Sequence, residues 1–260
     1  MKAVTRNILT AAVLMAALIY IASFLGVSAG KRNSAVCSGI RIAILDSARN
    51  SFVTPSEIRG YLKSEFGEIK GKPLNSLDLV RIENAVNGRS AVRKSEAFTT
   101  PDGILHIEVT QREPVVRFEN QKGGFYSDID GYIFPLQSSY TSYVPILDGD
   151  IPVRIKPGYK GEIQNAGERK WLMTVLEMID YMKRHDGWSD RIVQMSVRNN
   201  GDIVMIPREG KERFIFGRPD NYEEKFRMMG KYYTSIVPAK GEGYYSTVNV
   251  KYEGQVICRR

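Results

Sequence analysis

The sequence has little of what most enzyme and metal sites depend on. Its 260 residues include two histidines and two cysteines, and no C-x-x-C pair occurs. Zinc sites need Cys and His ligands at close spacing, and neither His106 nor His185 has such a neighbour. No phosphate-binding loop of the Walker type is present. These absences predict a protein that is not an enzyme and that carries no cofactor and no metal.

The sequence also has no block of basic residues, although its net charge is +8. Lys2 and Arg6 precede the first apolar run, and positions 1–30 contain no acid, so the rest of the chain carries +6 (8 − 2). Its Lys, Arg, Asp and Glu residues are interspersed. Nucleic-acid binders concentrate basic residues on one face or in one stretch, so the charge pattern indicates a mixed solvated surface and excludes nucleic acid as a partner.

One long apolar run is present, and it is uncharged over positions 8–27. A helix of this length rises about 30 Å, which matches the hydrocarbon layer of a bilayer. The small residues at 27–29 resemble a signal-peptide cleavage site, but the apolar core is longer than that of most signal peptides. We interpret 8–27 as a transmembrane helix with a cytoplasmic tail at 1–7. Cleavage of the segment remains an alternative, and both readings place the bulk of the chain outside the cytoplasm.

Cys37 follows this segment and Cys258 lies near the end of the chain. An exported domain permits a disulfide, but the sequence does not show that the two residues meet. We expect two unpaired thiols, and the pairing stays open.

After the apolar run, the pattern predicts a small domain at 36–112. Alternating isoleucines at 40–44 indicate a strand, and Thr54-Pro55-Ser56-Glu57 carries the signals of a capped helix start. A second helix is expected from about Asn75 to Gly88, with Leu77, Val80 and Ala85 turned inward. Strands follow around 90–98 and 105–109. The order strand, helix, helix, strand, strand predicts a sheet with two helices on one face, which resembles the POTRA module.

The stretch 111–136 is rich in Asp, Glu and Arg, and it could be read as an active site. Pro114 ends one ladder, and Asp-Gly at 130–131 is a hairpin signal. We therefore interpret the stretch as a junction followed by a hairpin, with Asp128 and Asp130 as turn residues.

The remainder, 113–260, predicts a mainly antiparallel β domain with flanking helices, so the fold class is α+β. The periodicity indicates two amphipathic helices whose apolar stripes belong to the core. The strands expected are Val115–Phe118, Phe125–Tyr126, Tyr132–Leu136, Ile192–Val197, Ile203–Ile206, Arg213–Phe216 and Tyr245–Cys258.

Several motifs of this part resemble the FtsQ/DivIB family of bacterial cell-division proteins. They are Arg-Glu-Pro at 112–114, Phe-Tyr-Ser-Asp-Ile-Asp-Gly-Tyr-Ile-Phe-Pro at 125–135, Val-Pro-Ile-Leu-Asp-Gly at 144–149, and Phe-Ile-Phe-Gly at 214–217 before a helix with an internal lysine. The segment 248–256 is similar to the family's closing strand, although Asn249 and Lys251 stand where Asp and Arg are common.

The resemblance implies a non-enzymatic scaffold of the divisome, anchored in the cytoplasmic membrane by one pass with its N-terminus inside. It also implies partners: FtsB and FtsL type proteins at the β domain, and other division proteins at the POTRA-like domain. The terminal segment 247–260 has strand-like sequence with no following element to cover it. A free sheet edge accepts an added strand, so we predict partner binding there through Tyr245, Tyr252, Gly254 and Val256.

Two other functions compete with this one. A POTRA-containing accessory protein of secretion or outer-membrane assembly should carry repeated modules or a membrane β-barrel, and neither pattern is visible. An exported cell-wall hydrolase should carry catalytic His and Cys residues in a recognisable motif, and the two histidines and two cysteines form none. The division scaffold is therefore the leading hypothesis.

Overall fold

The computed structural model describes residue 15 and residues 17–21, 35–120, 123–185 and 187–260. The chain divides into two compact units. The first holds the described residues up to Arg49 together with Val53–Gln111, and the second holds Asn50–Phe52 together with Arg112–Arg260. Most of the predicted transmembrane helix at 8–27 lies outside the described residues. Within the described ranges, no helix combines the length and apolar character needed to span a bilayer.

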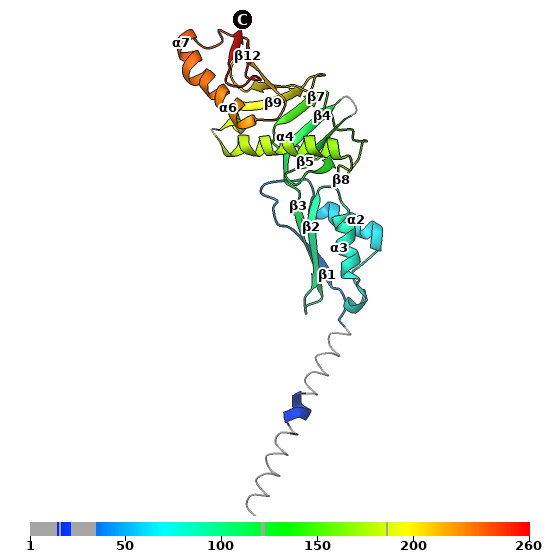
Figure 1. The fold of residues 1–260 in the computed structure, drawn as a ribbon. Helices are drawn as coiled ribbons and strands as arrows, with labels where there is room; N and C mark the ends of the chain where they lie inside the picture. Colours follow the sequence, from blue (N-terminus) through cyan, green and yellow to red (C-terminus); the bar gives the residue numbers. More distant parts are fainter. Residues whose placement is uncertain (1–14, 16, 22–34, 121–122, 186) are drawn as a thin grey trace, which may run out of the picture. The chain divides into compact units, whose positions relative to one another are not determined.

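The first unit has the predicted element order (Figure 1). Its elements are β1 (Gly39–Ile44), α2 (Pro55–Phe66), a 3-10 turn (Leu74–Ser76), α3 (Leu79–Asn87), β2 (Val92–Thr99) and β3 (Ile104–Gln111). Among the described residues, the strands form a three-stranded sheet in the order β1-β3-β2. β1 is parallel to the central strand β3, and β2 is antiparallel to it. The alternation on β3 buries Leu105, Ile107 and Val109 completely, which confirms the predicted apolar face.

The start of α2 is capped as the sequence predicts. The Thr54 hydroxyl accepts a hydrogen bond from the Glu57 amide (3.2 Å), and the Glu57 carboxylate accepts one from the Thr54 amide (2.8 Å). Pro55 fills the first helical position, where a missing N–H costs nothing. This reciprocal pair satisfies two otherwise free helix donors, so the capping box is confirmed.

The predicted inward face of α3 was wrong at Val80, whereas Leu77 and Ala85 are half-buried. The helix begins after the N-cap Asp78, whose side chain accepts the Arg81 amide (2.9 Å), and a 3-10 turn precedes it. Ile82 and Val86 are the buried residues, whereas Val80 is 64% exposed. The later start shifts the helical phase, so the i, i+4 pair at 82 and 86 faces the sheet.

The second unit is built on a large mixed sheet. Its elements are β4 (Pro114–Asn120), β5 (Gly123–Asp128), β6 (Tyr132–Pro135), β7 (Ile146–Gly149), β8 (Gly161–Glu162), α4 (Ala166–Arg184), α5 (Trp188–Arg191), β9 (Ile192–Val197), β10 (Ile203–Pro207), β11 (Arg213–Gly217), α6 (Tyr222–Lys231), the π-helical segment η2 (Tyr232–Ile236), α7 (Val237–Lys240), β12 (Thr247–Asn249) and β13 (Ile257–Arg259). In the described part of the chain, ten strands pair in the order β13-β12-β11-β10-β9-β7-β4-β5-β6-β8.

Most neighbours in this sheet are antiparallel, as predicted, but β7 is parallel to both β4 and β9, and β12 is parallel to β11. The sequence reading did not assign β7 or β8 as strands. β7 has only four residues and ends at Gly149, so its alternation is too short to identify it. The observed architecture is α+β, with helices beside mixed and antiparallel sheets.

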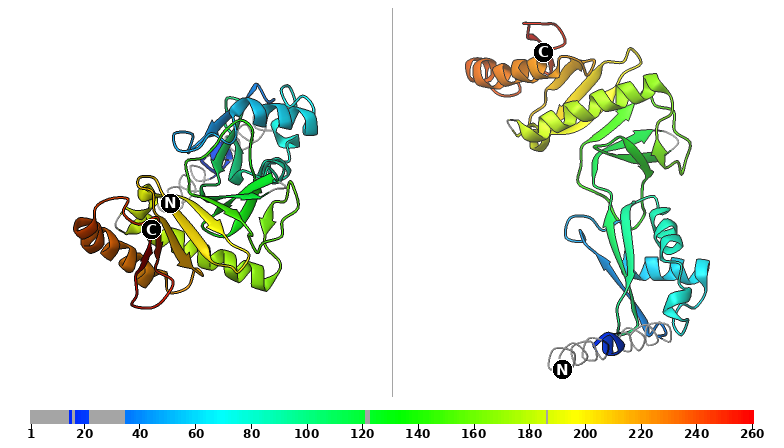
Figure 2. Two further views of the ribbon diagram at one scale, coloured as in Figure 1. Left: turned by 90° about the horizontal axis from the view of Figure 1, so that it is seen from above. Right: turned by 60° about the horizontal axis from the view of Figure 1, so that its bottom comes forward.

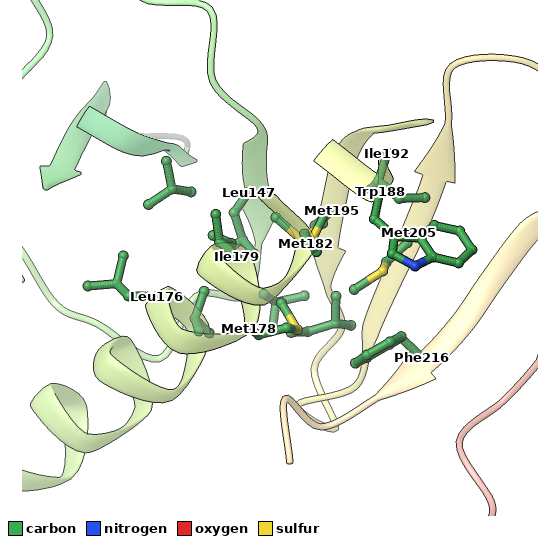
Figure 3. Close-up of a cluster of buried hydrophobic side chains, with 14 of the residues drawn as sticks. Leu147, Leu176, Met178, Ile179, Met182, Trp188, Ile192, Met195, Met205 and Phe216 are labelled. Carbon is green, nitrogen blue, oxygen red and sulfur yellow. The ribbon is translucent and has the colours of Figure 1, made fainter. Parts of the chain in front are cut away.

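The core of the second unit lies between the large sheet and helices α4 and α6. α4 runs along one face of the sheet (Figures 1 and 2) and buries the methionine and leucine stripe that the sequence assigned to the core. Figure 3 shows Met178, Ile179 and Met182 of α4 close to Leu147 of β7, with Trp188 and Met205 beyond them. These side chains are at most 3% exposed, so the stripe is core and not a binding surface.

The second amphipathic helix changes its hydrogen-bonding pattern partway along. α6 passes into η2, where the Val237 amide donates to the Tyr232 carbonyl, and then into α7. Pro238 lies in α7 and has no N–H to donate to the fourth carbonyl before it. A π segment is rare and occurs mostly as a single turn within an α-helix, as it does here. The aromatic stripe therefore continues inward at Tyr232 and Tyr233.

Asp128 does more than form a turn. Its carboxylate accepts the Tyr132 amide (2.9 Å) and pairs with the Arg112 guanidinium (2.7 Å), and both side chains are largely buried. The guanidinium also lies over the Tyr132 ring, 3.3 Å from its centroid. The charged stretch thus holds a structural ion pair in the second unit, and Gly131 (φ 81°) completes the turn.

Lys225 is the internal lysine of α6, and its ammonium fastens the turn that precedes the helix. It donates to the carbonyls of Arg218 (2.8 Å) and Asp220 (2.7 Å) and to the Asp220 carboxylate (2.7 Å). The side chain is 9% exposed, so its role is structural: it holds the turn at 218–220 against α6.

We expect Lys225→Met to lower the free energy of unfolding of the second unit by about 2–3 kcal/mol, because the part-buried hydrogen bonds to the carbonyls of Arg218 and Asp220 lose their charged donor. The exposed Lys231→Met on the same helix is the matched control and should cost less than about 0.5 kcal/mol. Urea unfolding of the full chain, followed by tryptophan fluorescence, measures both. Equal losses of unfolding free energy in the two variants would contradict a structural role for Lys225.

Candidate functional site

The C-terminal segment does not form the single closing strand that the sequence predicted. It forms a hairpin in which β12 pairs with β11 on one side and with β13 on the other. The chain turns at 252–254, where the Gln255 amide donates to the Tyr252 carbonyl (3.2 Å) and Gly254 adopts a φ of 66°. Glycine reaches this φ without steric cost, and Glu253-Gly254 was the turn signal that went unread. In the described part of the chain β13 neighbours only β12, so it is an edge strand of the sheet.

The four predicted binding residues lie on this hairpin and in the segment leading into it. Tyr252 is 51% exposed at the turn, so its side chain does not complete the core. Gly254 is exposed beside it. Tyr245 and Val256 are half-buried and pack against the core cluster. Two of the four thus fix the hairpin to the sheet, and two face solvent at its tip.

Sequence reasoning missed further exposed groups near the same edge. Ile257 on β13 is 38% exposed, and Tyr244 is 37% exposed. The Arg260 guanidinium lies over the Tyr244 ring, 4.2 Å from its centroid, and the Tyr244 and Tyr245 rings meet edge to face at 4.8 Å. Aromatic and arginine side chains commonly dominate the energy of protein interfaces. The unpaired edge of a terminal strand was the signal that could have pointed to them.

Lys251 anchors the hairpin to the neighbouring turn between β9 and β10. Its ammonium lies 2.7 Å from the carboxylate of Asp202, which is 6% exposed, and its amide donates to the Asn249 side chain (2.9 Å). A Cβ at Gly217 would lie 2.8 Å from the Lys251 Cγ, so the glycine makes room for this side chain. Asn249 and Lys251 depart from the family pattern, but their contacts still hold the hairpin against the turn between β9 and β10.

Two pKa shifts follow from this arrangement. The hydrogen bond to Asp202 raises the pKa of Lys251, so the ion pair persists at neutral pH and is lost only as the pH rises through that raised value. Burial raises the pKa of the Cys258 thiol, so little of it is the reactive thiolate near pH 7. Cys37 and Cys258 are both free thiols. Because Cys258 lies on β13, its reactivity reports on the state of the edge strand.

No metal or catalytic arrangement emerges from the described ranges. They hold no group of three His, Cys, Asp or Glu side chains suited to a metal ion. His106 stacks on Phe98 (5.0 Å) on the half-exposed face of β3, and His185 stacks on Tyr181 (4.1 Å) past the end of α4. Gly-Val-Ser-Ala-Gly at 26–30 matches the nucleophile-elbow pattern, which requires a strand–turn–helix context. It lies outside the described residues.

A small α+β unit with a β-α-α-β-β order, followed by a large mixed sheet with a terminal hairpin, defines the class of protein. This combination is that of a POTRA-like module joined to a β domain. A family model described as "POTRA-like domain" matches residues 35–110. The model described as "FtsQ/DivIB, C-terminal related" matches residues 113–259, which is more than half of the chain.

The protein belongs to the FtsQ/DivIB family. Members are membrane-anchored cell-division proteins with no enzymatic role, and the resemblance predicted from the sequence is confirmed. A search of curated proteins found no match.

Proposed function

We propose that this protein is a non-enzymatic scaffold of the bacterial divisome that links other division proteins at the septum. It is held in the cytoplasmic membrane by a single helix at 8–27, with 1–7 in the cytoplasm and the two domains, 36–112 and 113–260, outside. The family membership supports a division role, and the uncharged run of bilayer length supports the anchor.

The observation that carries the partner proposal is the β12–β13 hairpin at the edge of the large sheet. Its last strand presents backbone N–H and C=O groups along an open edge, and such an edge accepts an extended segment by strand addition. Exposed Tyr252 and Ile257 lie beside it. We propose that FtsB and FtsL type proteins bind here, with Tyr245, Tyr252, Gly254 and Val256 shaping the site.

Strand addition can happen in two ways at this hairpin. The partner strand can pair with the outer edge of β13, or it can displace β13 and pair with β12. β13 makes only three register pairs with β12, so its release would unpair few residues. The two ways predict opposite changes at Cys258, which lies opposite Val248 in the hairpin.

Iodoacetamide labelling of the full chain in a non-ionic detergent separates them, with peptide mass spectrometry distinguishing Cys258 from Cys37. Addition to the outer edge should slow the alkylation of Cys258 when the FtsB-type partner is bound. Displacement of β13 should accelerate it several-fold. An unchanged rate together with unchanged partner affinity after truncation at Glu253 would exclude the hairpin as the docking site.

A substitution at the tip of the hairpin gives an independent test. We expect Tyr252→Glu in the full chain to weaken binding of the FtsB-type partner at least tenfold, about 1.4 kcal/mol, because an exposed aromatic anchor is replaced by a solvated charge. Ile129→Glu is the matched control, since Ile129 is 42% exposed on the turn between β5 and β6. Calorimetry that shows equal losses for both variants would contradict the site.

The POTRA-like unit supplies the second set of contacts in this proposal. POTRA modules dock partner chains, and we propose that 36–112 binds other division proteins. Deletion of 36–112 from the full chain should remove these partners from co-purification and leave the FtsB-type partner bound. The opposite outcome is a deletion variant that loses the FtsB-type partner as well as the other division proteins. If its β domain still keeps its hydrogen-exchange protection, that result would contradict the assignment of separate partners to the two domains.

The anchor has its own test. The mature protein should retain 8–27, and mass spectrometry of the native N-terminus should find the peptides that precede Gly30. A mature chain beginning at Gly30 would show that the segment is a cleaved signal peptide.

A further inference from the structure

A second feature of the β domain is a cavity whose lining includes none of the residues named for strand addition. It has a volume of about 540 Å³ and lies between α5, the turn from β10 to β11, the η2–α7 helix and the loop before β12. This volume falls within the roughly 300–1,000 Å³ of ligand pockets. The residues that line it include four carboxylates, Asp190, Glu209, Glu212 and Glu242, and two guanidiniums, Arg191 and Arg208.

Glu212 is the notable member of this lining, because it is a carboxylate with only 4% exposure. Its Oε1 accepts the Tyr233 hydroxyl (2.8 Å), and its Oε2 accepts the Lys211 amide (3.0 Å). Within the part of the chain that the structure describes, no lysine, arginine or histidine forms an ion pair with it. A buried carboxylate without a cation is costly, so the site favours a ligand that brings the missing charge.

The two arginines of the wall are engaged elsewhere. Arg208 donates to the Asp190 carbonyl (3.0 Å) and to the Tyr143 hydroxyl. Arg191 lies over the rings of Trp188 (5.7 Å) and Tyr233 (5.6 Å), not against the carboxylate. Both guanidiniums keep their charge, and four carboxylates against two guanidiniums still give the lining a formal charge of −2 (2 − 4), which favours a cation over an anion.

The geometry around Glu212 suits one cation better than others. A carboxylate has about four lone-pair positions, and one on each oxygen is filled by the described donors. One position on each oxygen is left, which matches the two parallel N–H groups of a guanidinium.

Two local features keep the carboxylate in place. A Cβ at Gly210 would lie 2.4 Å from the Glu212 Oε2, so the glycine is what leaves room for the acid. Burial first, and then the hydrogen bond to Glu212, raise the pKa of Tyr233, so its hydroxyl stays protonated and donates. The acceptor is thus formed before a ligand arrives.

We propose that this cavity binds the guanidinium of an arginine side chain carried by a partner polypeptide, with Glu212 as its bidentate acceptor. A peptide-borne arginine is favoured over the free amino acid, because the carboxylate of the free amino acid would meet Glu209 and Glu242 at the lining. The inference goes beyond the proposed strand addition and does not depend on it.

Calorimetry with N-acetyl-arginine amide and the full chain in a non-ionic detergent tests the proposal. We expect saturable binding, no binding of the neutral isostere N-acetyl-citrulline amide, and weaker binding of free arginine. Glu212→Gln should lower the affinity at least tenfold. The glutamine oxygen can accept the Lys211 amide while its NH2 group donates to the Tyr233 hydroxyl oxygen, so the fold should be kept, and hydrogen exchange of α6 checks this.

Glu209→Gln is the matched control, since Glu209 is an exposed carboxylate of the same lining. It should change the affinity less than threefold. Equal binding of the arginine and citrulline amides, absence of saturable binding, or equal losses in both variants would overturn the assignment. Loss of arginine binding with intact FtsB-type binding would separate this cavity from the hairpin, so the two proposals can fail independently.

Discussion

Replacing Ile107 by aspartate is expected to abolish the folding of the POTRA-like unit. Ile107 has no exposed surface and lies in the middle of the central strand, opposite Ile42 on β1 and Ala97 on β2. A carboxyl group there has no hydrogen-bonding partner and no solvent, which costs about 4 kcal/mol or more. That loss is a large fraction of the total stability of a small domain.

Hydrogen exchange of the full chain measures this effect region by region. We expect amides of 36–112 to lose protection while those of 113–260 keep it. Ile42→Asp should cost less, because Ile42 lies on the edge strand β1 and is half-buried. Arg41→Asp is the matched exposed control on the same strand. Native protection of 36–112 in the Ile107 variant would refute the strand register.

The second large effect concerns the buried ion pair of the second unit. We expect Asp128→Ala to lower the free energy of unfolding by about 3–5 kcal/mol, because it leaves the Arg112 guanidinium buried without its partner. The side chains of Arg112 and Asp128 are 14% and 6% exposed, and the Tyr132 amide loses its acceptor as well. Urea unfolding of the full chain, monitored on the β domain, gives the value.

A double variant separates the contribution of the ion pair to the free energy of unfolding from the contribution of side-chain packing. Arg112→Met with Asp128→Leu removes both charges, and apolar replacement of a buried pair is often neutral. It should recover at least about 1 kcal/mol relative to Asp128→Ala. If the double variant is as unstable as the sum of the two single variants, the cost lies in packing around Tyr132 and not in the unpaired charge.

Local signals were sufficient for the POTRA-like unit and for the long helices. The capping box at Thr54 and the alternation on β3 depend only on neighbours in sequence, and both are confirmed. α4 was predicted from its apolar period, which nineteen residues make unambiguous. The face of α3 was wrong at Val80 because its nine residues allow several phases, and the cap at Asp78 decides between them.

The terminal hairpin could not be read from the same kind of signal. Strand-like residues run through 245–258, and only Gly254 marks the reversal. β7 carried an even weaker sequence signal. It has four residues, and a strand that pairs in parallel has no adjacent hairpin turn to mark it. The residues that line the Glu212 cavity come from segments far apart in the sequence, so no residue spacing could have predicted it.

β7 also has a consequence for how the β domain folds. On one side of it β4, β5, β6 and β8 form an antiparallel series, and on the other side β9, β10 and β11 form another. Within each series most neighbours are joined by short turns and can form early, whereas the parallel pairs of β7 close long loops and form slowly. In the described part of the chain β7 is the only strand that joins the two series. Gly149 fits at its end because a Cβ there would lie 2.2 Å from the Val197 carbonyl oxygen. Gly149→Ala should therefore slow the late step that joins the two halves, and the intermediate that accumulates would hold two separately folded half-sheets.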